Sequence, residues 1–268
     1  MSIEERWVAE KNDWKSIEEY VLFLKQKKAY QFVSEFCKDK DILDFGCGSG
    51  YGANFLATLA KKVMGVDISQ EVIDYCSDTH HHPTLSFQKI EANFSLPFAD
   101  NSFDVVVSFQ VIEHVSSVKK YLMELKRVVK ANGLIVITTP NKRHRLLPFQ
   151  KPWNTEHLRE YNLKNLKIVL ESIFSEVDFK GIYGTQEVNQ IEFNRVKQNP
   201  LRVYLLNPLK KLASHILPSS IIKYLKQEKN QISTHNSGVN SISKYGINDF
   251  SVGKDIRHCL DFLAVCRK

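Results

Sequence analysis

The sequence predicts an α/β fold, in which helices cover both faces of a Rossmann-like, doubly wound sheet of seven mostly parallel strands. Short apolar runs alternate with helical patterns through the first 140 residues, and right-handed crossovers connect the strands of such a chain. The run Phe103–Phe109 is almost wholly apolar, which is typical of a strand buried on both faces. Such sheets bind ligands beyond the carboxyl ends of their strands. We therefore expect the functional site in the loops after the first, second and fourth strands.

The predicted elements follow from capping residues, periodicity and turn residues. The first helix is expected over 16–37, with Ser16 as its cap and Glu18 and Glu19 in its first turn. A helix from about 118 to 129 should stop at Asn132 and Gly133. The other strands are expected at 41–45, 63–67, 85–90, 103–109, 133–139, 175–183 and 259–266, and the other helices at 53–60, 69–77 and 163–173.

Composition narrows the class of protein. The chain has 268 residues, of which 43% are apolar and 25% charged, as in ordinary globular proteins. No apolar run approaches the roughly 20 residues of a membrane-spanning helix, and Met1–Arg6 lacks a secretory signal pattern. Five cysteines without a C-x-x-C pair argue against a disulfide framework or zinc ribbon. We therefore expect a protein of the reducing cytoplasm.

Four segments are expected along the chain. They are an N-terminal helical cap (1–38), a core (39–184), a basic helical insertion (185–255) and a final core strand (256–268). Between Arg195 and Lys229, eight basic residues face one acid, Glu228, so this stretch alone carries the whole net charge of +7. Such a segment indicates either a solvated helix face or an anionic partner, namely a phosphorylated substrate, a membrane surface or nucleic acid. Its amphipathic part, 199–225, could form a lid, a dimer contact or a surface for a lipid-linked substrate.

A glycine-rich turn is the strongest local signal. Gly46, Gly48, Gly50 and Gly52 lie between a predicted strand and a predicted helix, where glycine lets the backbone approach a ligand closely. Asp67 ends the next strand and could accept both hydroxyls of a ribose. This combination predicts a nucleoside site.

Two cofactor classes are compatible with that turn. The turn can be aligned with the dinucleotide-binding motif G-x-G-x-x-G/A, but this alignment gives Asp44 no role. A carboxylate at Asp44 could instead organise the loop and hold, through water, the ammonium of an amino-acid tail. That arrangement favours S-adenosylmethionine over a nicotinamide dinucleotide.

Several motifs together resemble the class I S-adenosylmethionine-dependent methyltransferases of the type 11-like group. The matching runs are Asp44–Gly50 (DFGCGSG), Gly65–Ser69 (GVDIS), Leu96–Val106 (LPFADNSFDVV), Val111–Val115 (VIEHV) and Thr139–Asn141 (TPN). The resemblance covers about residues 40–180 and the last strand. It implies the strand order 3-2-1-4-5-7-6, with the seventh strand antiparallel, and S-adenosyl-L-methionine as cofactor.

The resemblance also implies a set of cofactor residues. Members of the family commonly place an Asp before the L-P-F element to bind the adenine amino group, whereas this chain has Glu91-Ala92-Asn93. Either Glu91 or the backbone of Ala92 takes that place. We expect the cofactor site to consist of Asp44, Gly46, Cys47, Gly48, Gly50, Asp67, Ile68, Glu91, Ala92, Phe109 and Gln110.

Two histidines are candidates for catalysis. Methyl transfer from a sulfonium is an in-line displacement that needs alignment, and a hydroxyl nucleophile also benefits from a general base. His114 follows the fourth strand beside Glu113, and His157 lies in a segment, His157–Tyr161, that resembles the family's H-x-x-E-[FY] run near the acceptor. Either histidine could equally serve only to cap a helix or order a loop.

Other candidates receive structural interpretations. Lys142–Arg145 could meet an anionic acceptor or face solvent. The histidines at 80–82 are expected in a solvent-exposed turn without a metal ion, and Cys47 is expected to fill space.

The leading functional prediction is O-methylation of a small molecule or sugar, such as a nucleotide- or lipid-linked glycan. The link to sugar acceptors comes from family analogy alone. An RNA methyltransferase is the alternative that the basic segment suggests, although no RNA-binding module or N-P-P-[FY] element is present. A non-catalytic S-adenosylmethionine-binding regulatory protein is the third.

Overall fold

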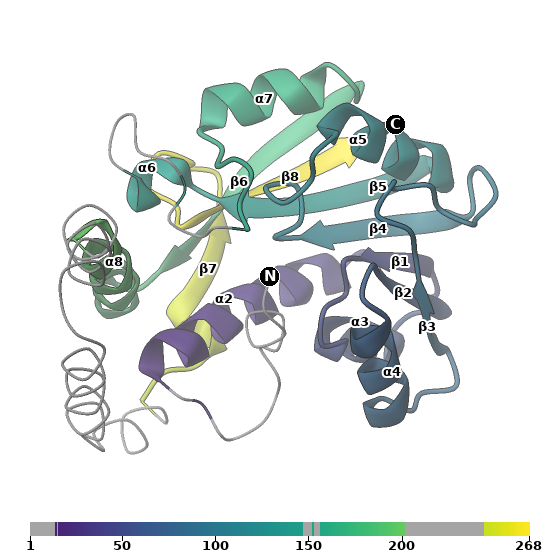
Figure 1. Cartoon of the computed structure of the whole chain (residues 1–268), viewed down its shortest axis with the longest axis horizontal. Coiled ribbons are helices and arrows are strands. Elements are labelled where there is room, and N and C mark those ends of the chain that lie inside the picture. Colours follow the sequence, from purple (N-terminus) through teal and green to yellow (C-terminus); the bar gives the residue numbers. More distant parts are fainter. Residues whose placement is uncertain (1–13, 15, 147–151, 153–155, 202–243) are drawn as a thin grey trace, which may run out of the picture.

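Eight strands form one mixed sheet in the computed structural model, which describes residues 14, 16–146, 152, 156–201 and 244–268 (Figure 1). The strands are β1 (Asp41–Phe45), β2 (Lys62–Asp67), β3 (Leu85–Lys89), β4 (Phe103–Phe109), β5 (Val129–Pro140), β6 (Glu176–Gly184), β7 (Phe250–Gly253) and β8 (Asp261–Arg267). Their order is β3-β2-β1-β4-β5-β8-β6-β7. The α-helices with described bounds are α2 (Ile17–Ser34), α3 (Tyr51–Ala57), α4 (Gln70–Thr79), α5 (Val118–Val128), α6 (Lys142–Arg145), α7 (Leu163–Glu171) and α8 (Gln186–Leu201).

The predicted fold class is confirmed, with one strand added. β8 is the expected seventh strand, and it lies antiparallel between β5 and β6, as the family resemblance implies. The additional strand is β7, which pairs antiparallel with β6 at the edge of the sheet. β7 lies inside the expected insertion 185–255 and was not predicted, because a four-residue strand ending in glycine has too little periodicity to be recognised. The residues 202–243 of that segment lie outside the described part.

Most predicted boundaries hold to within a few residues. Ser16 caps α2 by accepting a hydrogen bond from the Glu19 amide (3.3 Å), and Ser69 caps α4 in the same way for Val72 (3.4 Å). One predicted boundary, the start of the fifth strand, was wrong. α5 passes directly into β5 at Val129, four residues before the strand start that was expected at Gly133, and the β4–β5 register shifts between Phe103 and Val105.

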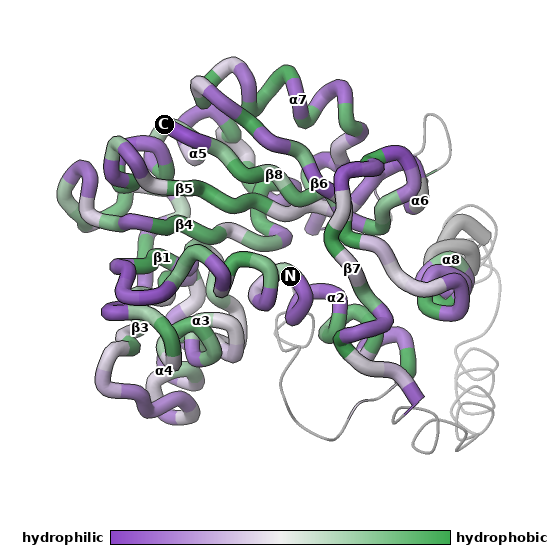
Figure 2. The backbone as a smooth tube through the Cα atoms, turned by 180° about the vertical axis from the view of Figure 1, so that it is seen from behind, coloured by the Kyte–Doolittle hydropathy of each residue, from purple (hydrophilic) through white to green (hydrophobic). Residues whose placement is uncertain are grey.

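Two apolar cores lie on opposite faces of the sheet. Successive strand residues point to opposite sides, so Leu43 and Val106 pack with α5 and α7, whereas Ile42 and Val105 pack with α2 and α3. Figure 2 shows the central strands as the most apolar part of the backbone. The molecule therefore has the layered α/β/α arrangement that the buried run in β4 predicted.

The carboxyl ends of β1, β2 and β4 meet at one edge of the sheet, because these strands are parallel neighbours. α2 contacts both α8 and β7, so segments far apart in the sequence border this edge (Figure 1). Within the described residues, no helix combines the length and apolar character needed to cross a lipid bilayer.

Candidate functional site

A cavity of about 430 Å³ opens at the carboxyl ends of β1, β2 and β4, and we call it the loop cavity. Pockets of this size accommodate cofactors and other small ligands. Nine predicted site residues line it: Gly46, Cys47, Gly48, Asp67, Ile68, Ala92, Phe109, Gln110 and His114. The sequence motifs therefore predicted many of the residues that form one wall of the loop cavity.

The glycine loop depends on left-handed backbone geometry. Gly46 and Gly50 both have φ of +77°, a region that other residues rarely adopt. A Cβ on Gly50 would also press against the side chains of Cys76 and His80. Gly50 was predicted to bind the cofactor, but it is not among the residues that line the loop cavity. It is a turn residue directly beside them.

His80 corrects the expectation of a wholly solvent-exposed histidine turn. Its Nε2 lies 2.8 Å from the carbonyl oxygen of Ser49, and the Cys76 thiol donates to the Gly48 carbonyl at 3.1 Å. Helix α4 thus supports the glycine loop from behind. His81 is exposed, as predicted.

Asp44 lies beneath the loop and is fully buried. Its carboxylate oxygens accept hydrogen bonds from the Tyr30 hydroxyl, at 3.2 and 3.0 Å. Burial raises the pKa of Asp44 to about 7, the Tyr30 hydrogen bond opposes that rise, and the nearby Asp67 adds to it. Tyr30, not Asp44, lines the loop cavity, so α2 provides the side chain that links the buried carboxylate to the cavity wall.

Asp67 lies at the end of β2 and lines the loop cavity while remaining 8% exposed. One of its oxygens accepts a hydrogen bond from the Ser69 amide at 3.0 Å, which fixes the carboxylate. Beside it, Ile68 presents an apolar side chain that is 43% exposed. A largely buried carboxylate can accept hydrogen bonds from the hydroxyls of a ribose, and an apolar surface beside it can pack against an aromatic base.

The two candidates for the adenine contact, Glu91 and Ala92, differ in whether they line the loop cavity. Ala92 lines the loop cavity, whereas Glu91 is exposed and is not among its lining residues. Phe94 lines the same region with a φ of +63°. The sequence analysis did not include Phe94, because an isolated aromatic residue in a loop gives no periodic signal.

Gln110 follows β4 in a left-handed conformation, with φ of +57°. For a residue with a side chain such a conformation costs about 1–3 kcal/mol and is found most often at functional sites. Its side-chain amide donates to Thr138 at 3.2 Å and to Asp261 at 3.0 Å. These bonds hold Gln110 at the boundary of the loop cavity.

The candidate catalytic histidines lie together. The His114 and His157 rings meet edge-on, with centroids 4.6 Å apart. Burial, reinforced by His157, lowers the pKa of His114 to about 4, so its ring is neutral near neutral pH. Glu113 beside them is fully buried, and burial raises its pKa to about 8. His157 is not among the residues that line the loop cavity.

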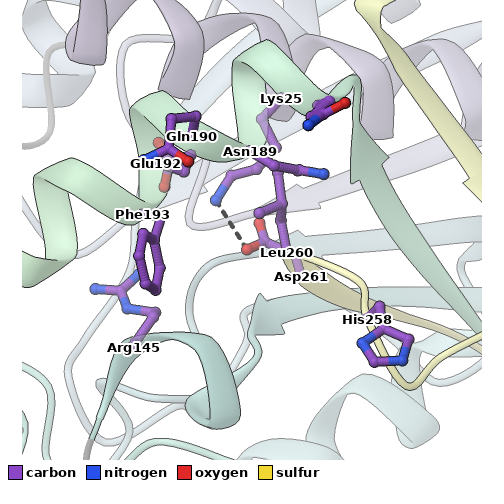
Figure 3. Close-up of a pocket in the computed structure, with 10 residues that line it drawn as sticks. Lys25, Arg145, Asn189, Gln190, Glu192, Phe193, His258, Leu260 and Asp261 are labelled. Carbon is purple, nitrogen blue, oxygen red and sulfur yellow. Dashed lines mark hydrogen bonds and ion pairs between the residues drawn. The ribbon is translucent and has the colours of Figure 1, made fainter.

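A second cavity of about 450 Å³, the α8 cavity, lies between α2, α6, α8 and the start of β8 (Figure 3). Helix α8 contributes Gln186, Asn189, Gln190, Glu192 and Phe193, and the other lining residues are Lys25, Arg145, His258, Leu260 and Asp261. Of the basic group predicted at 142–145, Arg145 lines this cavity and is paired with Glu160 at 3.5 Å. Lys142 and Arg143 do not line it, and the side chain of His144 lies outside the described part.

A buried ion pair connects the two cavities. Lys25 of α2 and Asp261 of β8 are each 2% exposed by side chain and lie 2.8 Å apart (Figure 3). The other oxygen of Asp261 accepts the hydrogen bond from Gln110. Asp261 therefore lines the α8 cavity while bonded to a residue of the loop cavity.

Sequence reasoning missed Tyr30, Lys25 and Asp261. Their partners are far away in the chain, and none of the three belongs to a motif. Residues 153–155, shortly before the His157–Tyr161 segment, lie outside the described residues.

Comparison with known proteins identifies the family. The pattern of the methyltransferase domain family matches residues 43–137. A ubiquinone biosynthesis O-methyltransferase of Rickettsia bellii is 30% identical over 201 residues, which cover 67% of this chain and 82% of that protein. The chain belongs to the class I S-adenosylmethionine-dependent methyltransferases. A probable S-adenosylmethionine-dependent methyltransferase of Mycobacterium tuberculosis is 33% identical over 60% of this chain, and the match spans 58% of that relative's length.

Solved structures agree on the fold. A methyltransferase from Thermotoga maritima superposes with a TM-score of 0.57 at 14% identity, covering 92% of both chains. The cofactor of this family is S-adenosylmethionine. The residues present fit this cofactor. The loop cavity contains a glycine turn and the Asp67 carboxylate for the ribose, and Tyr30 in its wall is hydrogen-bonded to the buried Asp44 carboxylate.

Proposed function

We propose that this protein transfers the methyl group of S-adenosylmethionine to a hydroxyl oxygen of a polyhydroxylated small molecule, such as a free, nucleotide-linked or lipid-linked sugar, held in the α8 cavity. The observation that carries the proposal is the boundary formed by Gln110 and Asp261, where a loop-cavity residue and an α8-cavity residue are hydrogen-bonded at 3.0 Å. The proposal places the methyl donor on one side of this contact and the acceptor on the other.

The lining of the α8 cavity favours an acceptor with several hydroxyl groups. Asn189 and Glu192 are among its lining residues, and their side-chain oxygens can accept hydrogen bonds. Hydroxyl groups are suitable donors. Phe193, which is 44% exposed, offers an apolar face beside these polar atoms, as sugar rings require.

The reaction needs little covalent help from the protein. The acceptor oxygen attacks the methyl carbon, an O–C bond forms while the C–S bond breaks, and S-adenosylhomocysteine leaves with the electron pair. The proton of the hydroxyl passes to a base or to water. The chain's contribution is to align the two reactants and exclude water. The catalytic role of His114 and His157 stays a prediction, and of the two only His114 lines the loop cavity.

The decisive experiment is incubation of the full chain with methyl-labelled S-adenosylmethionine and a panel of sugars, sugar nucleotides, lipid-linked sugars and transfer RNA. Mass spectrometry would identify the labelled product. We expect a methyl ether on a sugar hydroxyl. Labelled RNA would instead favour the RNA alternative, for which the described residues provide no specific support, because 202–229 lie outside them. Cofactor binding with no labelled product on any acceptor would favour a regulatory protein.

A matched pair of variants tests the acceptor cavity itself. Phe193→Ala removes the exposed aromatic face of the α8 cavity, and Phe55→Ala removes an aromatic ring of similar exposure (37%) on α3, outside that cavity. Loss of about 1.5 kcal/mol of apolar contact should raise the acceptor KM about tenfold in Phe193→Ala only. Cofactor affinity should be unchanged in both variants. Equal acceptor KM values in the two would contradict this location for the acceptor.

The cytoplasm remains the proposed compartment. All five cysteines are free and buried, which suits a reducing environment.

A further inference from the structure

Three potential metal ligands converge beside the loop cavity. Glu113 and His114 come from the loop between β4 and α5, and His157 comes from the segment that precedes α7. Each side chain offers one ligand atom, and these atoms all lie within 4.8 Å of one another. Glu113 and His157 are buried, and His114 is partly buried.

Hydrogen bonds orient both imidazole rings for coordination. His114 Nδ1 lies 3.0 Å from the carbonyl oxygen of Glu156, and His157 Nδ1 lies 3.1 Å from a carboxylate oxygen of Glu160. Both oxygens can only accept, so in the neutral rings the proton is on Nδ1 and the lone pair is on Nε2. A carboxylate or carbonyl behind a histidine in this manner is the usual outer shell of a metal ligand.

The third ligand has an unused buried oxygen. Glu113 is 0% exposed, and its Oε2 accepts a hydrogen bond from Thr139 at 3.0 Å. Its Oε1 is buried and has no hydrogen-bond partner. A buried carboxyl oxygen without a hydrogen-bond partner is unfavourable, and a cation that binds it in place of the proton would relieve it. The orphan oxygen is an observation separate from the grouping of the side chains.

We propose that Glu113, His114 and His157 bind a divalent transition-metal ion of the Zn²⁺ type through one carboxylate oxygen and two imidazole Nε2 atoms. Imidazole nitrogen with a carboxylate oxygen favours Zn²⁺ and similar ions over Mg²⁺ or Ca²⁺. Bonds of about 2.0–2.2 Å place ligands of one ion within about 4 Å of one another, so binding would contract the cluster slightly. Three protein ligands also leave a position for water or an acceptor oxygen.

This site changes the interpretation of the two histidines. With an ion bound, neither Nε2 can take a proton directly, so metal coordination would replace the role of general base that the sequence suggested. The sequence analysis expected no metal, because the neighbouring pair Glu113-His114 is too short a pattern and His157 joins it only through the fold.

Zn²⁺ itself is the probe. The full chain, first treated with a chelator, would be titrated with Zn²⁺ against a chromophoric competitor, together with His157→Asn, His114→Asn and the control His81→Asn. His81 is an exposed turn histidine outside the cluster. We expect one equivalent of tight binding in the wild type and in His81→Asn. In the two cluster variants we expect its loss or a weakening of at least about 100-fold, since removing only an outer-shell partner of a ligand already costs about 10- to 100-fold. The same stoichiometry and affinity in all four proteins would overturn the proposal.

A second measurement covers the case in which a cluster variant fails to fold. Co²⁺ added to the wild-type chain should give the intense visible absorption of a four- or five-coordinate site, and one equivalent of Zn²⁺ should abolish it. Absence of that band would also overturn the proposal. Neither readout involves methyl transfer, so failure here is distinguishable from failure of the proposed function.

Discussion

Two carboxylates at the same sheet edge differ in environment, and this difference separates their roles. Asp67 lies at the cavity surface with one oxygen held by the Ser69 amide, whereas Asp44 is fully buried and held by Tyr30. A carboxylate that lines the cavity can bind hydroxyls directly. A buried one responds to the charge of whatever occupies the cavity.

Replacement of Asp67 tests the ribose assignment. Asp67→Ala removes hydrogen bonds to a charged acceptor, each worth about 1.5–3 kcal/mol, so the Kd for S-adenosylmethionine should rise roughly 10- to 100-fold. Isothermal titration calorimetry would measure it. Asp74→Ala, an exposed acid on α4, is the control and should bind normally. Wild-type affinity in Asp67→Ala would refute the assignment.

Asp44 predicts a pH dependence of cofactor binding. Its pKa of about 7 means that the carboxyl is protonated below that pH and charged above it. A charged Asp44 attracts the ammonium of the methionine tail, so affinity should increase between about pH 6 and pH 7.5, below the pKa of an α-amino group near 8. Asp44→Asn should have a flat profile over this range. Tyr30→Phe keeps the carboxylate but loses the bond that lowers its pKa, so its midpoint should move upward. Identical profiles in all three proteins would exclude this role.

At the scale of elements, α2 is joined to the last strand by charge as well as by apolar packing. Its residues Val21, Leu24 and Val33 lie in the same core as Leu263 of β8. Lys25 and Asp261, in the middle of this contact, are both removed from water. Isolated buried charges are strongly destabilising, whereas complete replacement of a buried pair by apolar groups is often tolerated.

Lys25→Met should therefore destabilise the chain by about 3–5 kcal/mol, because it leaves the Asp261 charge buried without its cation. The double variant Lys25→Met with Asp261→Leu should recover most of that loss. Urea unfolding would measure both. Lys28→Met, on the same helix and hydrogen-bonded to Gln31 in an exposed position, should change stability by less than about 0.5 kcal/mol. A double variant as unstable as the single one would show that the pair is not the cause.

At the scale of the whole molecule, sequence predicts what is local or repeated and misses what the fold brings together. The strands β1, β4 and β5 were predictable because their apolar runs have a glycine, asparagine or proline near one end, and the glycine turn and Asp67 lie within contiguous motifs. The Tyr30–Asp44 and Lys25–Asp261 contacts join separate elements, and one polar side chain on a helix gives no sign of its partner. The edge strand β7 is too short to be recognised.

The last strand of the sequence, β8, lies inside the sheet with a paired strand on each side. β8 pairs with both β5 and β6, so Ala264 is opposite Ile137 on one side and Phe179 on the other. β7, although earlier in the sequence, is the edge strand among the described residues and pairs there with β6 alone, and Ser251 is exposed on it. Proline is excluded from central strands because it removes a ladder hydrogen bond, but it is accepted at edges. Stability should therefore depend on position in the sheet.

Ala264→Pro should abolish cooperative unfolding, because it breaks the ladder that holds β6 and β7 to the rest of the sheet. Ser251→Pro should lose about one hydrogen bond, or roughly 1 kcal/mol, and unfold cooperatively like the wild type. Circular dichroism during urea titration would compare the two. If both variants unfold with the same midpoint, the pairing of β8 on both sides does not determine the stability of the sheet.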